Sequence, residues 1–147
     1  MTSNIFDIIN SKLGLLRDYT ESEINCIEQW INFLIHQSKK ESRVKKERCE
    51  VCNSKDDYFE GHHVSGRKHD YRQITACRTC HDELSQMQKL RDIRWLDSNH
   101  SQSTKDAFFL QGLYDILILK SKKTGNSLYE KYASLLIEEI SWRLKAR

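Results

Sequence analysis

The chain has 147 residues, with 24 Lys and Arg against 21 Asp and Glu, six His, five Cys and no proline. This length fits one domain, or a small module inside a larger helical body. Hydrophobic residues make up 38% of the chain and charged residues 31%, so the apolar fraction is below the range usual for one large core. The absence of proline excludes collagen-like and proline-rich linker architectures and leaves long helices uninterrupted.

No segment approaches the roughly 18 to 20 consecutive apolar residues that a membrane span requires. The N-terminus has an acidic residue, Asp7, inside its first apolar run and lacks a basic segment before it, which does not match a signal peptide. We therefore expect a cytoplasmic protein with no membrane partner. In a reducing compartment, clustered cysteines bind metal more often than they form disulfides.

The first third of the chain is predicted to be helical. Apolar residues recur at near-helical spacing at Ile5, Ile8, Ile9, Leu13 and Leu16. A second helix would begin at a capping box formed by Thr20 with Glu23, and it would bury the stripe of Ile24, Ile27, Trp30, Ile31, Leu34 and Ile35. Cys26 falls between these stripe positions and has no cysteine partner near it, so we expect a half-buried structural thiol.

The net charge of +3 is too small to indicate nucleic-acid binding by itself, but the charge is unevenly distributed. Residues 39–48, KKESRVKKER, carry six basic and two acidic side chains, whereas residues 1–38 carry two basic and five acidic ones. This basic run stands directly before the first cysteine of the central segment. Taken alone, such a run is more often a solvated helix end than a binding surface.

The last third has the same helical character as the first. Ser103 with Asp106 can open a helix, which the residues Thr124-Gly125-Asn126 would end. A second helix would then begin at Ser127 and continue to Leu144 along one apolar stripe. We expect the two ends of the chain to pack as a small helical assembly around the middle.

Two CxxC pairs mark the middle of the chain, Cys49 with Cys52 and Cys77 with Cys80, and 24 residues separate them. Each pair can occupy one edge of a tetrahedron around Zn²⁺. One pair alone would be a weak signal, but two at this spacing predict a structural zinc site; a redox motif is the alternative. Few apolar residues lie between the pairs, so the metal would stabilise a segment with little core of its own.

Four of the six histidines, His62, His63, His69 and His81, fall within 20 residues inside or beside this frame. A zinc ion with four cysteine ligands needs none of them, so they indicate a second, catalytic site. Adjacent residues on a strand point to opposite faces. One of His62 and His63 can therefore hold a second metal while the other acts as a base. The alternative is a set of surface histidines or of substitute zinc ligands.

Three stretches between Cys49 and Ser85 carry a family resemblance: CEVC, GHHVSGRK and ITACRTCHDELS. They resemble the HNH endonuclease family, in particular the subgroup whose ββα-metal motif is supported by a four-cysteine zinc site. The resemblance covers roughly residues 48–90 and not the flanking segments. With those segments it implies an α+β, mostly helical fold: residues 1–47 are N-terminal helices ending in the basic run, 48–97 the zinc-stabilised ββα-metal module, and 98–147 a C-terminal helical pair.

The resemblance also assigns roles. His63 would be the general base at the end of the first strand, and His62 and His81 would hold a catalytic divalent cation such as Mg²⁺, Mn²⁺ or Ni²⁺. The four cysteines would hold a structural Zn²⁺. The central Asn of the family, which orients the base, has no counterpart, because either His69 or Arg72 stands there, depending on how the spacing is counted. Either His69 substitutes for this Asn in catalysis or catalysis is weakened.

These side chains suit phosphodiester hydrolysis. A neutral imidazole can accept the proton of an attacking water, and a cation held by only two imidazoles keeps open positions for phosphate oxygens. By resemblance, the products would have 5′-phosphate and 3′-hydroxyl ends. Basic side chains could bind the nucleic-acid backbone without reading its sequence. They are Lys39, Lys40, Arg43, Lys45, Lys46, Arg48, Arg67, Lys68, Arg72 and Arg78.

The sequence therefore predicts a metal-dependent endonuclease acting on DNA, although it does not distinguish DNA from RNA. The main alternative is a zinc-stabilised nucleic-acid-binding or assembly module whose nuclease site has decayed, which the missing central Asn favours. A third interpretation is a protein-interaction adaptor built from the helices, with a purely structural zinc site. A homodimer or larger assembly through the flanking helices is a further expectation.

Overall fold

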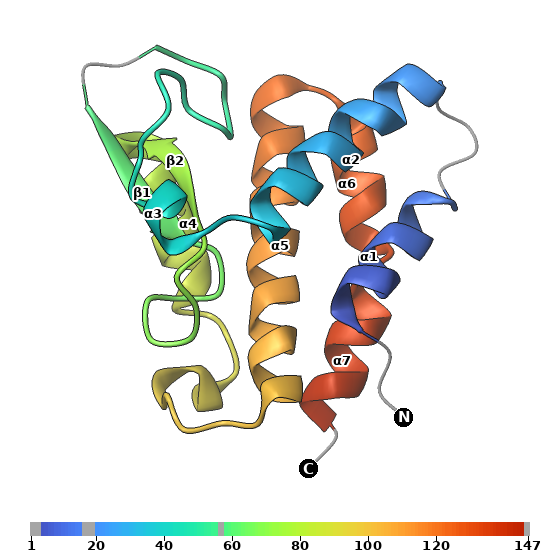
Figure 1. Cartoon of the computed structure of the whole chain (residues 1–147), viewed down its shortest axis with the longest axis vertical. Helices are drawn as coiled ribbons and strands as arrows, with labels where there is room; N and C mark the ends of the chain where they lie inside the picture. Colours follow the sequence, from blue (N-terminus) through green and yellow to red (C-terminus); the bar gives the residue numbers. More distant parts are fainter. Residues whose placement is uncertain (1–3, 16–19, 56–57, 146–147) are drawn as a thin grey trace.

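The computed structural model describes residues 4–15, 20–55 and 58–145. They form an α+β, mostly helical fold with one two-stranded antiparallel sheet, which confirms the predicted fold class (Figure 1). In chain order the elements are the helices α1 (Ile5–Leu13), α2 (Glu21–Ile35) and α3 (Lys39–Ser42), the strands β1 (Phe59–His63) and β2 (Gln73–Cys77), helix α4 (Arg78–Gln88), the 3₁₀ helix η1 (Ile93–Leu96), and the helices α5 (Gln102–Thr124), α6 (Ser127–Ser134) and α7 (Ile137–Lys145). None of the described helices is long and apolar enough to cross a membrane.

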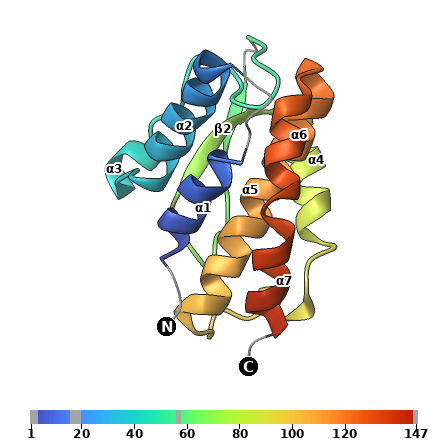
Figure 2. The same cartoon turned by 90° about the vertical axis from the view of Figure 1, so that its right-hand side faces the viewer.

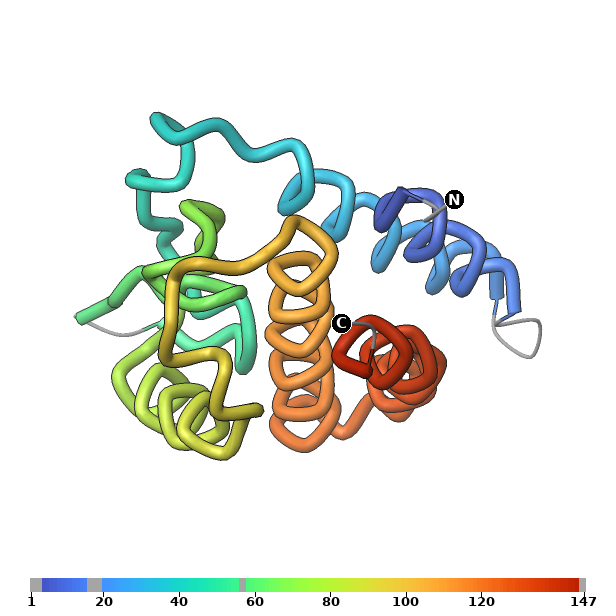
Figure 3. The backbone as a smooth tube through the Cα atoms, turned by 90° about the horizontal axis from the view of Figure 1, so that it is seen from below, coloured from blue at the N-terminus to red at the C-terminus, as the bar shows by residue number. Residues whose placement is uncertain are grey.

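Helix α5 lies in the middle of the molecule, with the sheet and α4 on one side and α6 and α7 on the other (Figures 1 and 3). Three consecutive residues of α5, Phe108, Phe109 and Leu110, are all buried. Consecutive buried positions point in different directions around a helix, so α5 is enclosed rather than amphipathic. Because its neighbours come from both ends and from the middle of the chain, the described residues of all three predicted segments contribute to one hydrophobic core.

The two N-terminal helices bury the stripes that the sequence predicts. Ile9 on α1 and Ile31 on α2 are completely buried, and the two helices pack against each other on one side of the molecule (Figure 2). The capping box at the start of α2 is confirmed, because Thr20 and Glu23 exchange side-chain and backbone hydrogen bonds. Leu16, the last residue of the first predicted stripe, lies outside the described residues.

Three local predictions were wrong. Cys26 is exposed rather than half-buried, because its position on α2 faces away from the core. Helix α5 begins earlier than expected, with Ser101 as its cap, accepting a hydrogen bond from the N–H of Thr104 at 3.3 Å. The last predicted helix is interrupted around Leu135, so the C-terminal region has three helices where a pair was expected.

The sheet has two distinct faces. Strands β1 and β2 pair so that His62 lies opposite Ile74 and His63 opposite Gln73. Since side chains alternate along a strand, Glu60 and His62 share the face that α4 covers. Gly61, His63 and Gln73 share the opposite face. This pairing agrees with the prediction that the adjacent residues His62 and His63 point to opposite faces.

The free edge of β2 is covered by side chains rather than by a third strand. Gln37, at the end of α2, accepts a hydrogen bond from the N–H of Gln73 at 2.9 Å and donates one to its carbonyl oxygen at 3.0 Å. Farther along the strand, a carboxylate oxygen of Glu50 accepts from the N–H of Thr75, and the N–H of Glu50 donates to the carbonyl of Thr75. These bonds satisfy the edge of a sheet that has only two strands and attach it to the N-terminal helices.

Helix α5 approaches the segment after β1 more closely than a side chain would allow. A Cβ atom on Gly112 would lie 1.7 Å from the carbonyl oxygen of Val64, the residue that follows His63. We therefore predict that Gly112→Ala lowers the free energy of unfolding by about 1–3 kcal/mol or more, measured by urea denaturation. Gly14→Ala is the control, because its nearest neighbour would be 3.3 Å away at a helix end. Equal stability of the two variants would contradict this packing.

Candidate functional site

The two CxxC pairs come together, as predicted. The sulfur atoms of Cys49, Cys52, Cys77 and Cys80 all lie within 4.8 Å of one another, and we call this group the four-cysteine cluster. Three of its members are buried, and Cys52 is partly exposed. The sulfur atoms of Cys52 and Cys77 are 3.8 Å apart, which matches the spacing of about 3.8 Å between ligands of a tetrahedral zinc with Zn–S bonds of about 2.3 Å.

The local structure around each CxxC pair directs its two sulfur atoms toward the four-cysteine cluster. In the first pair, the N–H of Asn53 donates to the carbonyl of Cys49 at 2.9 Å, and the N–H of Cys52 donates to the sulfur of Cys49 at 3.5 Å. Asn53 has a φ of 60°, a left-handed conformation that Asn tolerates better than most residues. In the second pair, Cys77 ends β2 and caps α4, but its thiol makes no capping hydrogen bond.

The protonation of these thiols fits metal ligands. Burial raises the pKa of Cys49 and of Cys80. At Cys52 the hydrogen bonds from Ser54 outweigh the effect of burial and lower the pKa to about 7. Buried thiols become thiolates when a divalent cation compensates their charge. The donor set, its burial and its spacing therefore fit a zinc ion with no open coordination position.

Zinc binding can be tested with a matched pair of cysteine variants. Cys77→Ser removes one ligand of the four-cysteine cluster, whereas Cys26→Ser removes the exposed thiol of α2. We expect one zinc per chain by elemental analysis for the wild type and for Cys26→Ser. Cys77→Ser should have less zinc and a lower Tm, because structural zinc contributes free energy of folding. Full zinc content in Cys77→Ser would show that this sulfur is not a ligand.

The side chain of His62 lies on the face of the sheet that α4 covers and is only 3% exposed. Burial, together with the charges of His81 and Arg91, lowers the pKa of His62 to about 3, so its ring is neutral. The side-chain amide of Gln88 donates to Nε2 of His62 at 3.3 Å and to the carbonyl of His63 at 3.1 Å. Nε2 of His62 therefore presents a lone pair toward the end of α4.

His81, in the first turns of α4, lies against His62. Their ring centroids are 5.6 Å apart and the rings meet edge to face. Nδ1 of His81 donates to a carboxylate oxygen of Glu60 at 2.9 Å, and the other oxygen of Glu60 accepts from the hydroxyl of Tyr58 at 3.0 Å. A carboxylate on one ring nitrogen is the usual way in which a metal-binding imidazole is oriented with its other nitrogen free.

His63, the predicted general base, is partly buried at the end of β1. Burial and the charge of Arg67 lower its pKa, while the charge of Asp70 raises it, so both side chains belong to its surroundings. Arg67 is exposed. Asp70 is held by the guanidinium of Arg72 at 2.5 Å. The ring of His63 is thus neutral near neutral pH, and the exposed guanidinium of Arg67 and the carboxylate of Asp70 are in its surroundings.

The segment that follows α4 makes hydrogen bonds to the backbone just after His63. The buried guanidinium of Arg91 donates to the carbonyl of Ser65 at 3.0 Å and to a carboxylate oxygen of Asp115 on α5 at 3.2 Å. The indole N–H of Trp95 donates to the same carbonyl of Ser65 at 2.7 Å. These contacts connect the end of β1 with α5 and restrict where the ring of His63 can lie.

The two candidates for the central Asn position lie elsewhere. Nε2 of His69 is 2.7 Å from the carbonyl of Trp95, and its ring packs on Phe108 at a centroid distance of 4.8 Å. These contacts place His69 between η1 and α5, and its predicted catalytic role stays a prediction. Arg72 is largely buried, with its guanidinium 4.1 Å from the ring of Phe109, so it is engaged within the fold rather than presented to a ligand.

The side chains of the other predicted basic residues differ in whether they bind other parts of the protein. Lys46 pairs with Glu50 at 2.7 Å, Arg48 donates to the carbonyl of Asn53, and Lys68 donates to the carbonyl of Leu96. The remaining residues of the set are exposed, and their side chains make no hydrogen bond or ion pair with another described residue. They are Lys39, Lys40, Arg43, Lys45, Arg67 and Arg78.

Sequence reasoning missed several residues that shape this region. Glu60 stands two positions before His62 on the same strand, so the alternation of side chains could have found it. Gln88 stands seven residues after His81, the spacing of one helix face, and could have been found in the same way. No local signal marks Arg91, because its partners lie on the segment after β1 and on α5.

Comparisons of the chain with protein-family models, with curated proteins and with solved structures gave no match in any of the three. Among the described residues, the four-cysteine cluster is the single group of three or more potential ligands that lies close enough to hold one metal ion. His62 and His81 form a separate pair, whose rings meet edge to face.

Proposed function

We propose that this protein is a metal-dependent endonuclease of the HNH type that hydrolyses phosphodiester bonds in DNA. One observation carries the proposal: the β1–β2–α4 unit sets His62 against His81 and puts His63 next along the strand, with the four-cysteine cluster at the junction of β2 and α4. This order of strand, strand and helix, with histidines at these points, is what the resemblance to the family implies.

Each residue of the site has a role in this proposal. The neutral imidazole of His63 accepts the proton of the attacking water. Arg67, exposed and close to His63, binds a non-bridging oxygen of the scissile phosphate. His62 and His81 hold a divalent cation through their Nε2 atoms. When bound, this cation stabilises the charge on the phosphate and on the leaving 3′ oxygen. Glu60 keeps Nδ1 of His81 protonated, so that Nε2 faces the cation.

The direct test is plasmid nicking by the wild type and by His63→Ala, with Mg²⁺, Mn²⁺ or Ni²⁺ added. The loss of a general base typically lowers the rate by 10²–10⁴-fold, so we expect the variant to be inactive over the same time course. Zinc content and far-UV circular dichroism should not change, because the ring of His63 makes no hydrogen bond or aromatic contact with another residue that the structure describes. His36→Ala, at the exposed end of α2, is the control and should cut normally. Equal activity of His63→Ala and the wild type would refute the assignment.

The cation site has a test that does not depend on cleavage. Glu60→Gln keeps the shape of the side chain but removes the charge that orients His81. Loss of such an outer partner typically weakens metal binding 10- to 100-fold. We expect this change in the Mn²⁺ dissociation constant, measured by electron paramagnetic resonance on the zinc-loaded protein. Glu130→Gln, on exposed α6 surface, should leave it unchanged. Unaltered Mn²⁺ binding in Glu60→Gln would exclude this site.

A second candidate function is a nucleic-acid-binding or assembly module with a decayed nuclease site. Two observations favour it. Nε2 of His62 is engaged by Gln88, and both candidates for the central Asn make other contacts. In that case the protein would bind DNA in a salt-dependent way, hold one zinc and cut nothing with any divalent cation. Tight Mn²⁺ binding that depends on Glu60 would count against it.

A further inference from the structure

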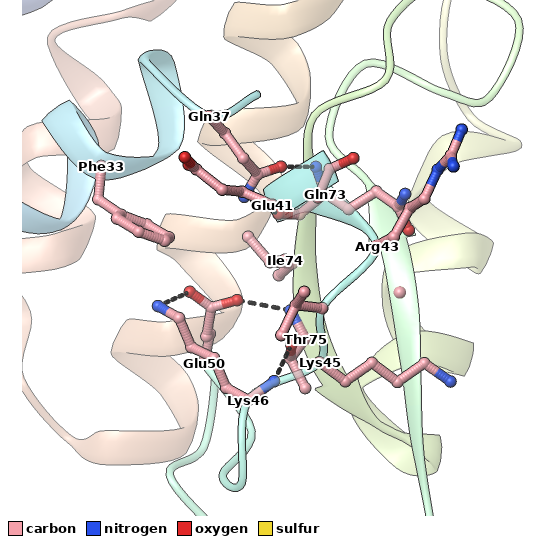
Figure 4. Close-up of a pocket in the computed structure, with 13 residues that line it drawn as sticks. Phe33, Gln37, Glu41, Arg43, Lys45, Lys46, Glu50, Gln73, Ile74 and Thr75 are labelled. Carbon is pink, nitrogen blue, oxygen red and sulfur yellow. Dashed lines mark hydrogen bonds and ion pairs between the residues drawn. The ribbon is translucent and has the colours of Figure 1, made fainter. Parts of the chain in front are cut away.

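A cavity of about 240 Å³ lies on the face of the sheet opposite α4. Its floor is formed by Gly61, Gln73 and Thr75 of the two strands, and its walls by Phe33 of α2 and by the basic segment after α3 (Figure 4). Nothing in the proposed chemistry of His62, His63 and His81 uses this cavity. The basic run that precedes the first cysteine therefore forms the rim of a hollow rather than a plain solvated surface.

The cavity is next to the predicted base. Gln73 is the cross-strand partner of His63, and paired residues on one face of a sheet have Cβ atoms about 5 Å apart. Gly61 is two residues before His63 on the same face, a separation of about 6.6 Å along the strand. A group in the cavity would thus be within one nucleotide of a phosphate at His63.

The inner surface of the cavity combines the aromatic ring of Phe33, with Nζ of Lys46 lying 4.4 Å from its centroid, and the side-chain amide of Gln73. The ring of Phe33 is 46% exposed and faces the hollow in Figure 4. The backbone of Gln73 is engaged by Gln37, but no hydrogen bond from its carboxamide to another described residue is recorded. This carboxamide lies over Gly61, where a Cβ atom would be 2.1 Å from its oxygen. The glycine therefore makes room for the amide on the cavity floor.

The charges around the cavity favour an anion at its rim. Both carboxylates that line it have partners: Glu41 caps α3, and Glu50 is bound to Lys46 and to the edge of β2. Arg43 and Lys45, in contrast, are exposed and extend away from Phe33 in Figure 4. The exposed cations of Arg43 and Lys45 thus stand at the rim of a hollow that contains the ring of Phe33 and the amide of Gln73.

We propose that this cavity binds a nucleobase of the strand that is cut at His63. The base displaces Nζ of Lys46 from the ring of Phe33 and stacks there. The carboxamide of Gln73 meets the polar edge of the base, and Arg43 and Lys45 bind the flanking phosphates. The proposal rests on the proposed function. A base can enter the cavity only when it is out of the helical stack, so the site favours single-stranded or locally opened DNA. Aromatic stacking tolerates any base, which fits the absence of a sequence-reading motif.

The test compares two ligands with the same charge. One is a 12-nucleotide oligothymidylate, and the other is an abasic oligomer of equal length. Binding is measured by fluorescence anisotropy on the zinc-loaded protein without added divalent cation. Phe33→Ala should weaken binding of oligothymidylate five- to tenfold, as expected for one lost stacking contact, and leave binding of the abasic oligomer unchanged. Trp142→Ala, which removes another half-exposed aromatic on α7, is the control and should change neither.

Gly61→Ala gives a second, independent variant. Its Cβ would displace the carboxamide of Gln73 into the cavity, so it should also weaken only the base-dependent part of binding.

A loss of affinity for both oligomers in Phe33→Ala, or for neither, would overturn the inference and leave the nuclease proposal intact. If the wild type binds neither oligomer, the proposed function itself fails. Binding of free thymidine monophosphate as tight as that of the oligomer would also overturn it, because the ligand would then be a free nucleotide.

Discussion

The arrangement of the central segment, from Cys49 to the end of α4, depends on the meeting of the four sulfur atoms of the four-cysteine cluster. A two-stranded sheet is at best marginally stable in water, and the one helix that follows it directly, α4, has only 11 residues. The four-cysteine cluster joins the turn after Cys49 to the end of β2 and the start of α4. A zinc ion bound by the four sulfur atoms would fix these three pieces at one point. Because Cys77 is both the last residue of β2 and the cap of α4, the same point sets the direction of α4 and brings His81 against His62.

Contacts from outside the four-cysteine cluster also support the sheet. Side chains of Gln37 and Glu50 occupy the open edge of β2, and α5 supports the other end of the sheet through Gly112 and Asp115. The N-terminal and C-terminal helices are therefore the scaffold of the histidine site rather than appendages to it. They also create the cavity beside His63, since α2 and the segment after α3 form its walls.

Sequence reasoning found the parts of the fold that local chemistry encodes. The CxxC spacing predicted the cluster, the capping box at Thr20 predicted the start of α2, and strand alternation predicted that His62 and His63 diverge. It failed where contacts between distant residues decide. Arg91 binds Ser65 and Asp115, each more than 20 residues away, and the edge contacts of Gln37 join α2 to β2. It also gave a single helix after Gly125, although tertiary packing interrupts that helix near Leu135.

We propose that the protein has two metal sites of different kinds. Anomalous diffraction from crystals grown with zinc and soaked in Mn²⁺ would test it most directly. We expect a full zinc peak inside the four-cysteine cluster and a separate manganese peak next to His62 and His81, with the amide of Gln88 displaced from Nε2 of His62. A zinc peak alone, with Gln88 still bound to His62 at saturating Mn²⁺, would contradict the account.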